Sequence, residues 1–204
     1  MAAAVMQDTG RELRRIVRSN EEIKSVVATA FKINLMAMNA IFLAKRAGQT
    51  ALGFGVLSNE LRRFAMDLQK QMSQLREMTY GSVSTVTALV KQSRLTRVLE
   101  RARKESTGTG RKLIEDHLRM RDGFGSNRHR EQIVALNRKL DQMIADTAQL
   151  VELGSVLARS AKIEAAYGGP FSAALMQVSS DFERTIGDIQ RSLESLTKQQ
   201  DATL

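Results

Sequence analysis

The sequence predicts an all-α fold in which long antiparallel helical hairpins pack as a four-helix bundle or coiled coil. Three observations predict it. Straight-chain helix formers and Ala dominate the chain, Pro occurs once, and aromatic residues make up only 4% of the 204 residues. Apolar residues recur at spacings of three and four over long stretches. Gly-rich clusters at 47–53 and 167–171 interrupt these stretches and would form two hairpin tips.

The first hairpin is expected within residues 1–105, with its first helix at 9–46. A heptad stripe, the pattern of long helices packed side by side, runs along that helix. The stripe consists of Ile16, Ser19, Ile23, Val26, Ala30, Ile33, Ala37, Ala40 and Ala44. Gly48 and Gly53 then supply turn conformations that other residues resist.

The second helix is expected at 54–104, and "ESTGTGRK" ends it. Its apolar stripe becomes weaker after Met78. The expected stripe is Phe54, Leu57, Leu61, Phe64, Leu68, Gln71, Leu75, Met78, Ser82, Thr85 and Leu89. Both helices should therefore bury one narrow face against partner helices.

A basic connector at 106–129 follows, with a short helix expected at 112–121. The second hairpin should occupy 130–204, with helices at 130–166 and 172–198. Its turn is "YGGPF", where Gly168, Gly169 and Pro170 cannot continue a helix. We expect the two hairpins to pack together as one domain.

Positive charge is concentrated in one part of the chain. Residues 91–130 hold twelve Lys and Arg against five Asp and Glu, which is +7 of the total net charge of +9. Such an excess is typical of a surface for nucleic acid, anionic lipid or a phosphorylated partner. The alternative is a solvated end of the bundle with local ion pairs. The candidate anion-binding residues are Arg97, Arg101, Arg103, Lys104, Arg111 and Lys112.

Several classes of function have no support in the sequence. The chain has no Cys and two His, and "GTGRK" lacks the glycine spacing of a phosphate-binding loop. We therefore predict no catalytic residues, no metal site, no cofactor and no enzymatic activity. The longest apolar run, 35–44, is shorter than a membrane span, and the N-terminus lacks a signal-peptide pattern. We expect a cytoplasmic protein.

The first tip and its flanks read FKINLMAMNAIFLAKRAGQTALGFGVLSNELRRFA at residues 31–65. This stretch resembles the cytoplasmic signalling tip of bacterial chemoreceptors, the methyl-accepting chemotaxis proteins. Sixteen of the 35 positions match the family pattern without gaps. They are Phe31, Asn34, Leu35, Ala37, Asn39, Ala40, Ala44, Arg46, Ala47, Gly48, Gly53, Phe54, Val56, Glu60, Arg62 and Ala65.

The resemblance implies a signalling or scaffold protein whose tip binds a chemotaxis-type histidine kinase or a coupling adaptor protein. It places Leu35 and Val56 where these partners dock, with Glu60 and Arg62 in the same neighbourhood. It also implies recruitment to a membrane-associated signalling array or to the cell pole. The alternative is a structural bundle without a signalling role that acts through its basic end on a membrane surface or on nucleic acid.

The resemblance also places Phe31, Asn39 and Arg46 at positions through which receptor dimers associate into trimers. Two of these residues have simpler explanations. Asn39 would be a buried polar residue that fixes helix register, and Arg46 a favourable cation at a helix C-terminus. Leu43 stands where the family has Glu, which removes a charge partner for Arg46 and puts trimers of the family type in doubt.

A second, weaker copy of the tip appears at 155–186, which aligns with 34–65 at a constant offset of 121. Identical residues in the second copy are Ala158, Ala161, Ala165, Gly169 and Ser179. Glu164 keeps the acid that Leu43 replaces in the first copy, and it is the candidate partner-binding residue of the second tip. The alternatives are a chance match between helices and a true duplication. A duplication would let one chain mimic the two hairpins that a receptor dimer supplies from two chains.

Overall fold

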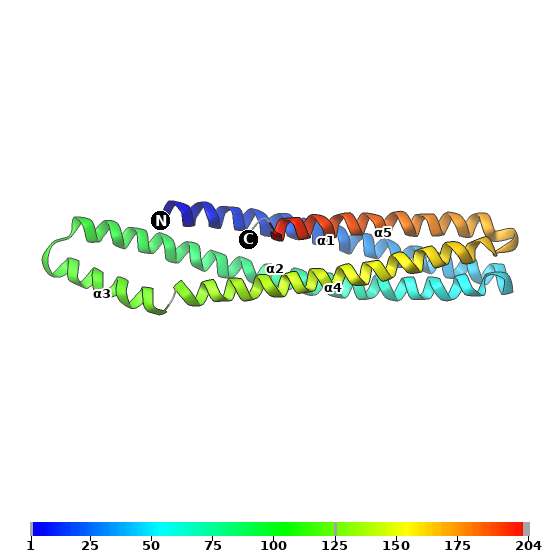
Figure 1. The fold of residues 1–204 in the computed structure, drawn as a ribbon, viewed down its shortest axis with the longest axis horizontal. Helices are drawn as coiled ribbons and strands as arrows, with labels where there is room; N and C mark the ends of the chain where they lie inside the picture. Colours follow the sequence, from blue (N-terminus) through cyan, green and yellow to red (C-terminus); the bar gives the residue numbers. More distant parts are fainter. Residues whose placement is uncertain (1, 125, 202–204) are drawn as a thin grey trace. The chain divides into compact units, whose positions relative to one another are not determined.

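The computed structural model describes the backbone of residues 2–124 and 126–201, and the side chains of 14–88, 90–120, 131–132 and 134–199. The described chain is all-α, as the sequence predicts. Its long helices are α1 (Ala2–Ala47), α2 (Leu52–Glu105), α4 (Ser126–Ala166) and α5 (Ser172–Asp201). A shorter helix, α3, spans Gly108–Phe124, and the 3-10 turns η1 (Gly48–Ala51) and η2 (Gly169–Phe171) close the two hairpins (Figure 1).

Helix boundaries differ from the prediction at the N-terminus, where α1 begins at Ala2 rather than at residue 9, and in the connector. The expected short helix at 112–121 is longer at both ends, and α4 begins at Ser126 rather than at residue 130. Gly residues suggested breaks there, but a Gly inside a helix costs only about 1 kcal/mol and does not end it. Gly125, in the predicted break "DGFGSN", lies outside the described residues.

The chain forms two compact units, each built from segments distant in sequence. The first, which we call the basic unit, comprises residues 1–19 and 77–140. The second, which we call the tip unit, comprises residues 20–76 and 141–204 and contains both hairpin turns. Figure 1 shows the two turns at the same end of the tip unit.

The tip unit is a four-helix bundle. Polar and close contacts join α1 to α5 through Ser195 and Glu22, whose side-chain oxygens are 3.2 Å apart. They join α4 to α5 through Gln190, which donates to the Ser155 hydroxyl at 3.1 Å. At the tip, α2 packs against α1, because a Cβ added to Gly55 of α2 would lie 3.4 Å from Cβ of Ala44 of α1. Each hairpin therefore packs against the other as well as on itself.

The predicted heptad stripe of α1 is buried along its full length. Its nine residues are each 7% exposed or less, and from Ala30 to Ala40 the stripe residues are fully buried. Small Ala side chains at this seam let neighbouring helices approach closely. The first-helix prediction is confirmed.

The predicted stripe of α2 is correct in part. Its buried residues are Phe54, Leu61, Phe64, Leu68, Leu75 and Ser82, whereas Leu57, Gln71, Met78 and Thr85 are partly exposed. The side chain of Leu89 lies outside the described residues. The second row of the seam is one position further along the helix. It consists of Ala51, Ser58, Ala65, Met72, Thr79 and Val86. Hydrophobicity pointed to the larger Leu57 and Met78, whereas close helix packing selects small residues for the seam.

The basic unit buries fewer side chains. Its buried apolar residues among the described side chains are Ile16, Val86, Leu118 and Leu140. Arg15 of α1 donates to Oδ1 of Asn137 of α4 at 3.0 Å, which ties these helices together. The unit carries 18 Lys and Arg against 9 Asp and Glu, whereas the tip unit carries 13 of each. The entire net charge of the chain therefore lies in the basic unit.

One helical stretch, residues 14–105, contains a window long and apolar enough to cross a membrane by length and composition, with a mean hydropathy of 1.7. In the folded chain, 28% of that window is buried. Core helices of bundles meet the same criterion, and α1 and α2 supply the buried seams of the tip unit.

Candidate functional site: the hairpin tip

The two tip turns share one backbone geometry. Gly48 and Gly169 adopt φ of +69° and +55°, a region that side chains with a Cβ avoid. The Thr50 hydroxyl donates to the carbonyl of Ala47 at 3.0 Å, which closes η1. A Cβ on Gly169 would lie 4.0 Å from Oγ1 of Thr50, so the two turns adjoin.

The other predicted turn glycines have different roles. Gly53 is the second residue of α2, not part of the turn, and the carboxylate of Glu164 from α4 lies against its Cα. Gly168 precedes η2 with φ of −72°, and it is buried beneath Leu175. At both positions a neighbour approaches the glycine closely, and neither glycine has a left-handed backbone.

The first hairpin carries exposed apolar side chains on α1 and α2. Leu35 is 42% exposed and Val56 is 62% exposed, although both helices bury other apolar residues in the core. Phe31 is 53% exposed, and Phe42 and Leu52 are exposed as well. Sequence reasoning missed Phe42 and Leu52 because apolar residues near a seam are ordinarily assigned to the core. A cluster of this kind on a water-exposed surface is typical of an interaction site.

Polar residues accompany this cluster. Arg46 and Arg62 are exposed, and Glu60 forms an ion pair with Arg63 of the next helical turn at 3.0 Å. Asn39 is exposed, so the alternative that it fixes register in a buried seam is wrong. The seam passes instead through its neighbours Ala37 and Ala40. Asn39 is therefore available to a partner.

The core of the second hairpin repeats that of the first at an offset of 121. Fully buried pairs related in this way include Ala37 with Ala158, Ala40 with Ala161 and Phe54 with Leu175. Ser58 and Ser179 are also fully buried. Each donates its hydroxyl to the carbonyl four residues earlier, at 2.8 and 3.0 Å. With Gly48 and Gly169, these pairs give the two hairpins the same internal architecture.

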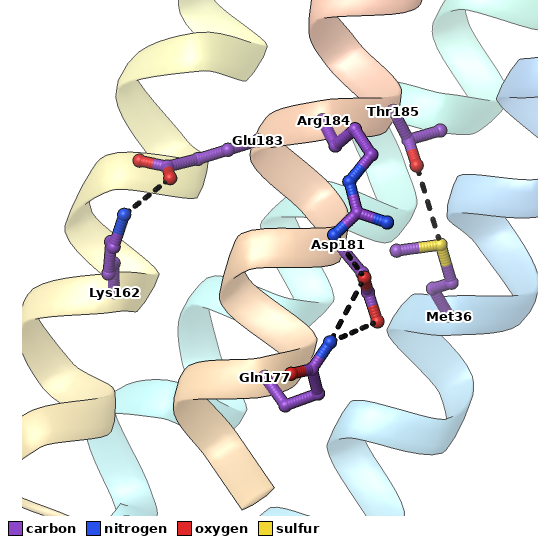
Figure 2. Close-up of polar contacts among 7 residues, drawn as sticks. All are labelled: Met36, Lys162, Gln177, Asp181, Glu183, Arg184 and Thr185. Atoms are coloured by element: carbon purple, nitrogen blue, oxygen red, sulfur yellow. Dashed lines mark hydrogen bonds and ion pairs between the residues drawn. The ribbon is translucent and has the colours of Figure 1, made fainter. Parts of the chain in front are cut away.

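The outer surfaces of the two hairpins differ. At the offset of 121, the exposed Val56 corresponds to Gln177, which donates to the Asp181 carboxylate at 3.3 Å. Arg62 corresponds to Glu183, which pairs with Lys162 of α4 at 2.6 Å. Figure 2 shows both contacts on the second hairpin.

The remaining tip positions diverge only in part. Leu35 and Phe42 correspond to Val156 and Ile163, which are also apolar and are 49% and 63% exposed. Two other positions do differ. Phe31 corresponds to Glu152 and Arg46 to Tyr167. Within the tip unit, residues 20–76 hold eight Lys and Arg against four acids, whereas residues 141–204 hold five against nine. The two hairpins thus share a core and present surfaces of opposite charge.

Across the described residues, no group of three or more His, Cys, Asp or Glu could hold a metal ion. The predictions of no enzymatic activity and no cofactor stay predictions. What the tip offers is a contact surface of apolar side chains edged by charged and amide groups.

Comparisons with known proteins point to one class. Methyl-accepting chemotaxis protein TlpQ of Pseudomonas aeruginosa is 35% identical over 83 residues, which cover 39% of this chain and 12% of that protein. Methyl-accepting chemotaxis protein I of Escherichia coli is 28% identical over 86 residues, covering 40% of this chain and 16% of that protein. A Synechocystis protein named as a methyl-accepting chemotaxis protein is 24% identical over 199 residues, 94% of this chain.

This chain is similar to a divergent signalling domain of the methyl-accepting chemotaxis proteins. It spans less than one fifth of the length of these relatives. No family model matches the chain, and no solved structure matches it. The match over nearly the whole chain includes both hairpins, which fits a chemoreceptor-like helical bundle.

Proposed function

We propose that this protein is a chemoreceptor-like signalling or scaffold component whose first hairpin tip binds a chemotaxis-type histidine kinase or its coupling adaptor. The observation that carries the proposal is the 62% exposure of Val56 between the fully buried Phe54 and Ser58 on α2. An exposed valine side chain contributes no hydrophobic stabilisation to the fold at that position. It would contribute to the free energy of binding if a partner covered it.

Binding would follow the usual anatomy of a small interface. Leu35 and Val56 would enter apolar pockets of the partner, and the surrounding polar residues would set orientation and exclude wrong partners. Glu60, Arg62 and Arg46 supply charges of both signs at this edge. Asn39 adds an amide that can donate and accept hydrogen bonds. Phe31, Asn39 and Arg46 would also serve any self-association of tips.

The test is a binding titration of the purified chain against the histidine kinase and the coupling adaptor of its own organism. Val56→Glu and Leu35→Arg each place a charge in the apolar contact and should weaken binding at least about tenfold, because an unpaired buried charge is costly. Both residues are exposed in the free protein, so the variants should fold normally. Circular dichroism and thermal melting check this.

The second hairpin supplies matched controls. Gln177→Glu and Val156→Arg place the same charges at the positions related to Val56 and Leu35 by the offset of 121. These variants should bind as the unaltered protein does. The proposal fails if neither partner binds, or if the two sets of variants weaken binding equally.

A further inference from the structure

The basic unit carries all of the net charge and, on α2 and α3, a set of exposed apolar side chains that the tip function does not use. We propose that this surface is a docking site for an anionic lipid membrane. It would hold the protein at a bilayer in the plane of the headgroups, without crossing the bilayer. The proposal is independent of what the tip binds.

The first observation is the exposed face of the C-terminal half of α2. Lys91, Arg94, Leu95, Val98 and Arg101 recur at helical spacing on that face, and all are exposed. Leu95 and Val98 are 50% and 63% exposed. At about 100° per residue, Leu95 and Val98 lie on either side of Lys91, and Arg94 and Arg101 border them on one side. Apolar side chains next to basic ones on an exposed helical face are typical of helices that lie in a membrane interface.

The second observation is α3, which repeats the arrangement two residues after α2 ends. Leu113 and Met120, seven residues apart on one side of α3, are 73% and 69% exposed. Lys112 and Arg119 precede them by one residue each and are exposed as well. Within α3, Leu118 is only 8% exposed, so one side of the helix is buried and the other is exposed.

Charge complementarity selects the occupant. The basic unit carries twice as many Lys and Arg as Asp and Glu, and a surface of that kind is attracted to anionic headgroups. Nucleic acid would satisfy the charge equally well, but it offers no site for Leu113, Met120 and Val98. Base stacking would call for several aromatic side chains, and among the described side chains of the basic unit Tyr80, 56% exposed on α2, is the single aromatic one.

The experiment is co-sedimentation of the whole protein with vesicles of phosphatidylcholine, with and without about one-third phosphatidylserine. Binding should require the anionic lipid and should fall as salt is added. Arg94→Gln/Arg101→Gln/Lys104→Gln should reduce binding at least about tenfold, because each Lys or Arg near the surface contributes separately. Lys70→Gln/Arg76→Gln/Lys198→Gln removes the same charge from the tip unit and should have little effect.

A second pair of variants tests the apolar contribution. Leu113→Ser/Met120→Ser should also weaken vesicle binding, whereas Leu153→Ser/Met66→Ser, at exposed positions of the tip unit, should not. Parallel titrations use a fluorescent single-stranded oligonucleotide and a short duplex at the same salt. The proposal is overturned by absence of vesicle binding, by full binding of the Leu113/Met120 variant, or by tighter binding to either nucleic acid than to vesicles.

Discussion

Glu164 of α4 lies directly over Gly53 of α2, so that a Cβ on Gly53 would be 2.6 Å from the carboxyl carbon of Glu164. The two residues belong to different hairpins. A comparable approach occurs deeper in the bundle, where a Cβ on Gly154 would be 2.6 Å from Cζ of Phe64. Both glycines let α2 and α4 approach closely. The Glu164 side chain that faces Gly53 can change its rotamer more easily than the Phe64 ring that faces Gly154.

Alanine at these two glycines should therefore have opposite effects on the free energy of unfolding. The Glu164 carboxylate is the end of a flexible, partly exposed side chain and can swing into water. Gly53→Ala should leave stability unchanged or raise it by up to about 1 kcal/mol through helix propensity. Phe64 is only 3% exposed, so Gly154→Ala should destabilise the fold by about 1–3 kcal/mol through overpacking.

Urea denaturation followed by circular dichroism measures both variants. Gly53→Ala/Glu164→Ala serves as the control, because removing the carboxylate removes the reason for any cost at Gly53. Equal destabilisation by Gly53→Ala and Gly154→Ala would contradict the greater freedom of the Glu164 carboxylate to move away from the added methyl group.

The left-handed turn glycine gives a separate prediction about backbone strain. Gly48 has φ of +69° and nothing within 4 Å of a built Cβ, so Ala there meets no steric clash with neighbours. Gly48→Ala should still cost about 1–2 kcal/mol from the backbone alone, and Gly48→Asn should cost less. Thermal unfolding measures the difference.

Gly81 is the matched control for Gly48. It lies inside α2, and a built Cβ there also meets nothing within 4 Å. Gly81→Ala should therefore stabilise the protein by up to about 1 kcal/mol, since a helical Gly is replaced in open space. A stabilising effect at both positions would show that the η1 turn does not have the conformation described.

The sequence predicted the buried seams of the helices well where they consist of apolar residues and poorly where they consist of small polar ones. The α1 seam was predictable because its heptad is unbroken and lies next to exposed polar positions such as Lys32 and Arg46. The α2 seam was not, since Ser58 and Thr79 are polar and small and gave no apolar signal. Ser58 and Thr79 are buried because neighbouring helices cover them, and the residue spacing within one helix does not show where its neighbours lie.

The sequence likewise identified some of the exposed apolar residues of the candidate site and missed others. The resemblance to the chemoreceptor tip identified Leu35 and Val56, and both are exposed. Phe42 and Leu52 were missed because a pattern of apolar spacing does not tell a core face from a contact face. The duplication suggested at 155–186 gained support from burial rather than from identity, because Phe54 and Leu175 differ in sequence but are both fully buried.

The repeated core predicts a monomer in solution. Each of the four long helices already buries its seam within one chain, including Ile33 of α1, Leu61 of α2, Ala161 of α4 and Phe182 of α5. Among the described side chains of the tip unit, each buried seam is filled by residues of the same chain. Light scattering on the free protein should give a mass near 22.7 kDa. An obligate homodimer at all concentrations would contradict a single-chain mimic of the receptor dimer.

The divergent surfaces predict one bound partner per chain, although the two hairpins share a core. The first hairpin presents Val56 and Arg62, whereas the second presents Gln177, held by Asp181, and Glu183, held by Lys162. Isothermal titration calorimetry with the coupling adaptor should therefore give a one-to-one complex.

Transplanting the surface should create a second site. Lys162→Ile/Gln177→Val/Glu183→Arg gives the second hairpin the residues found at 41, 56 and 62 of the first. The ion pair it removes is partly exposed and should cost no more than about 1 kcal/mol, so folding should survive. Two partners bound to the unaltered protein would contradict the asymmetry. An unchanged one-to-one complex of the folded triple variant would show that Val56 and Arg62 are not enough to define the docking surface.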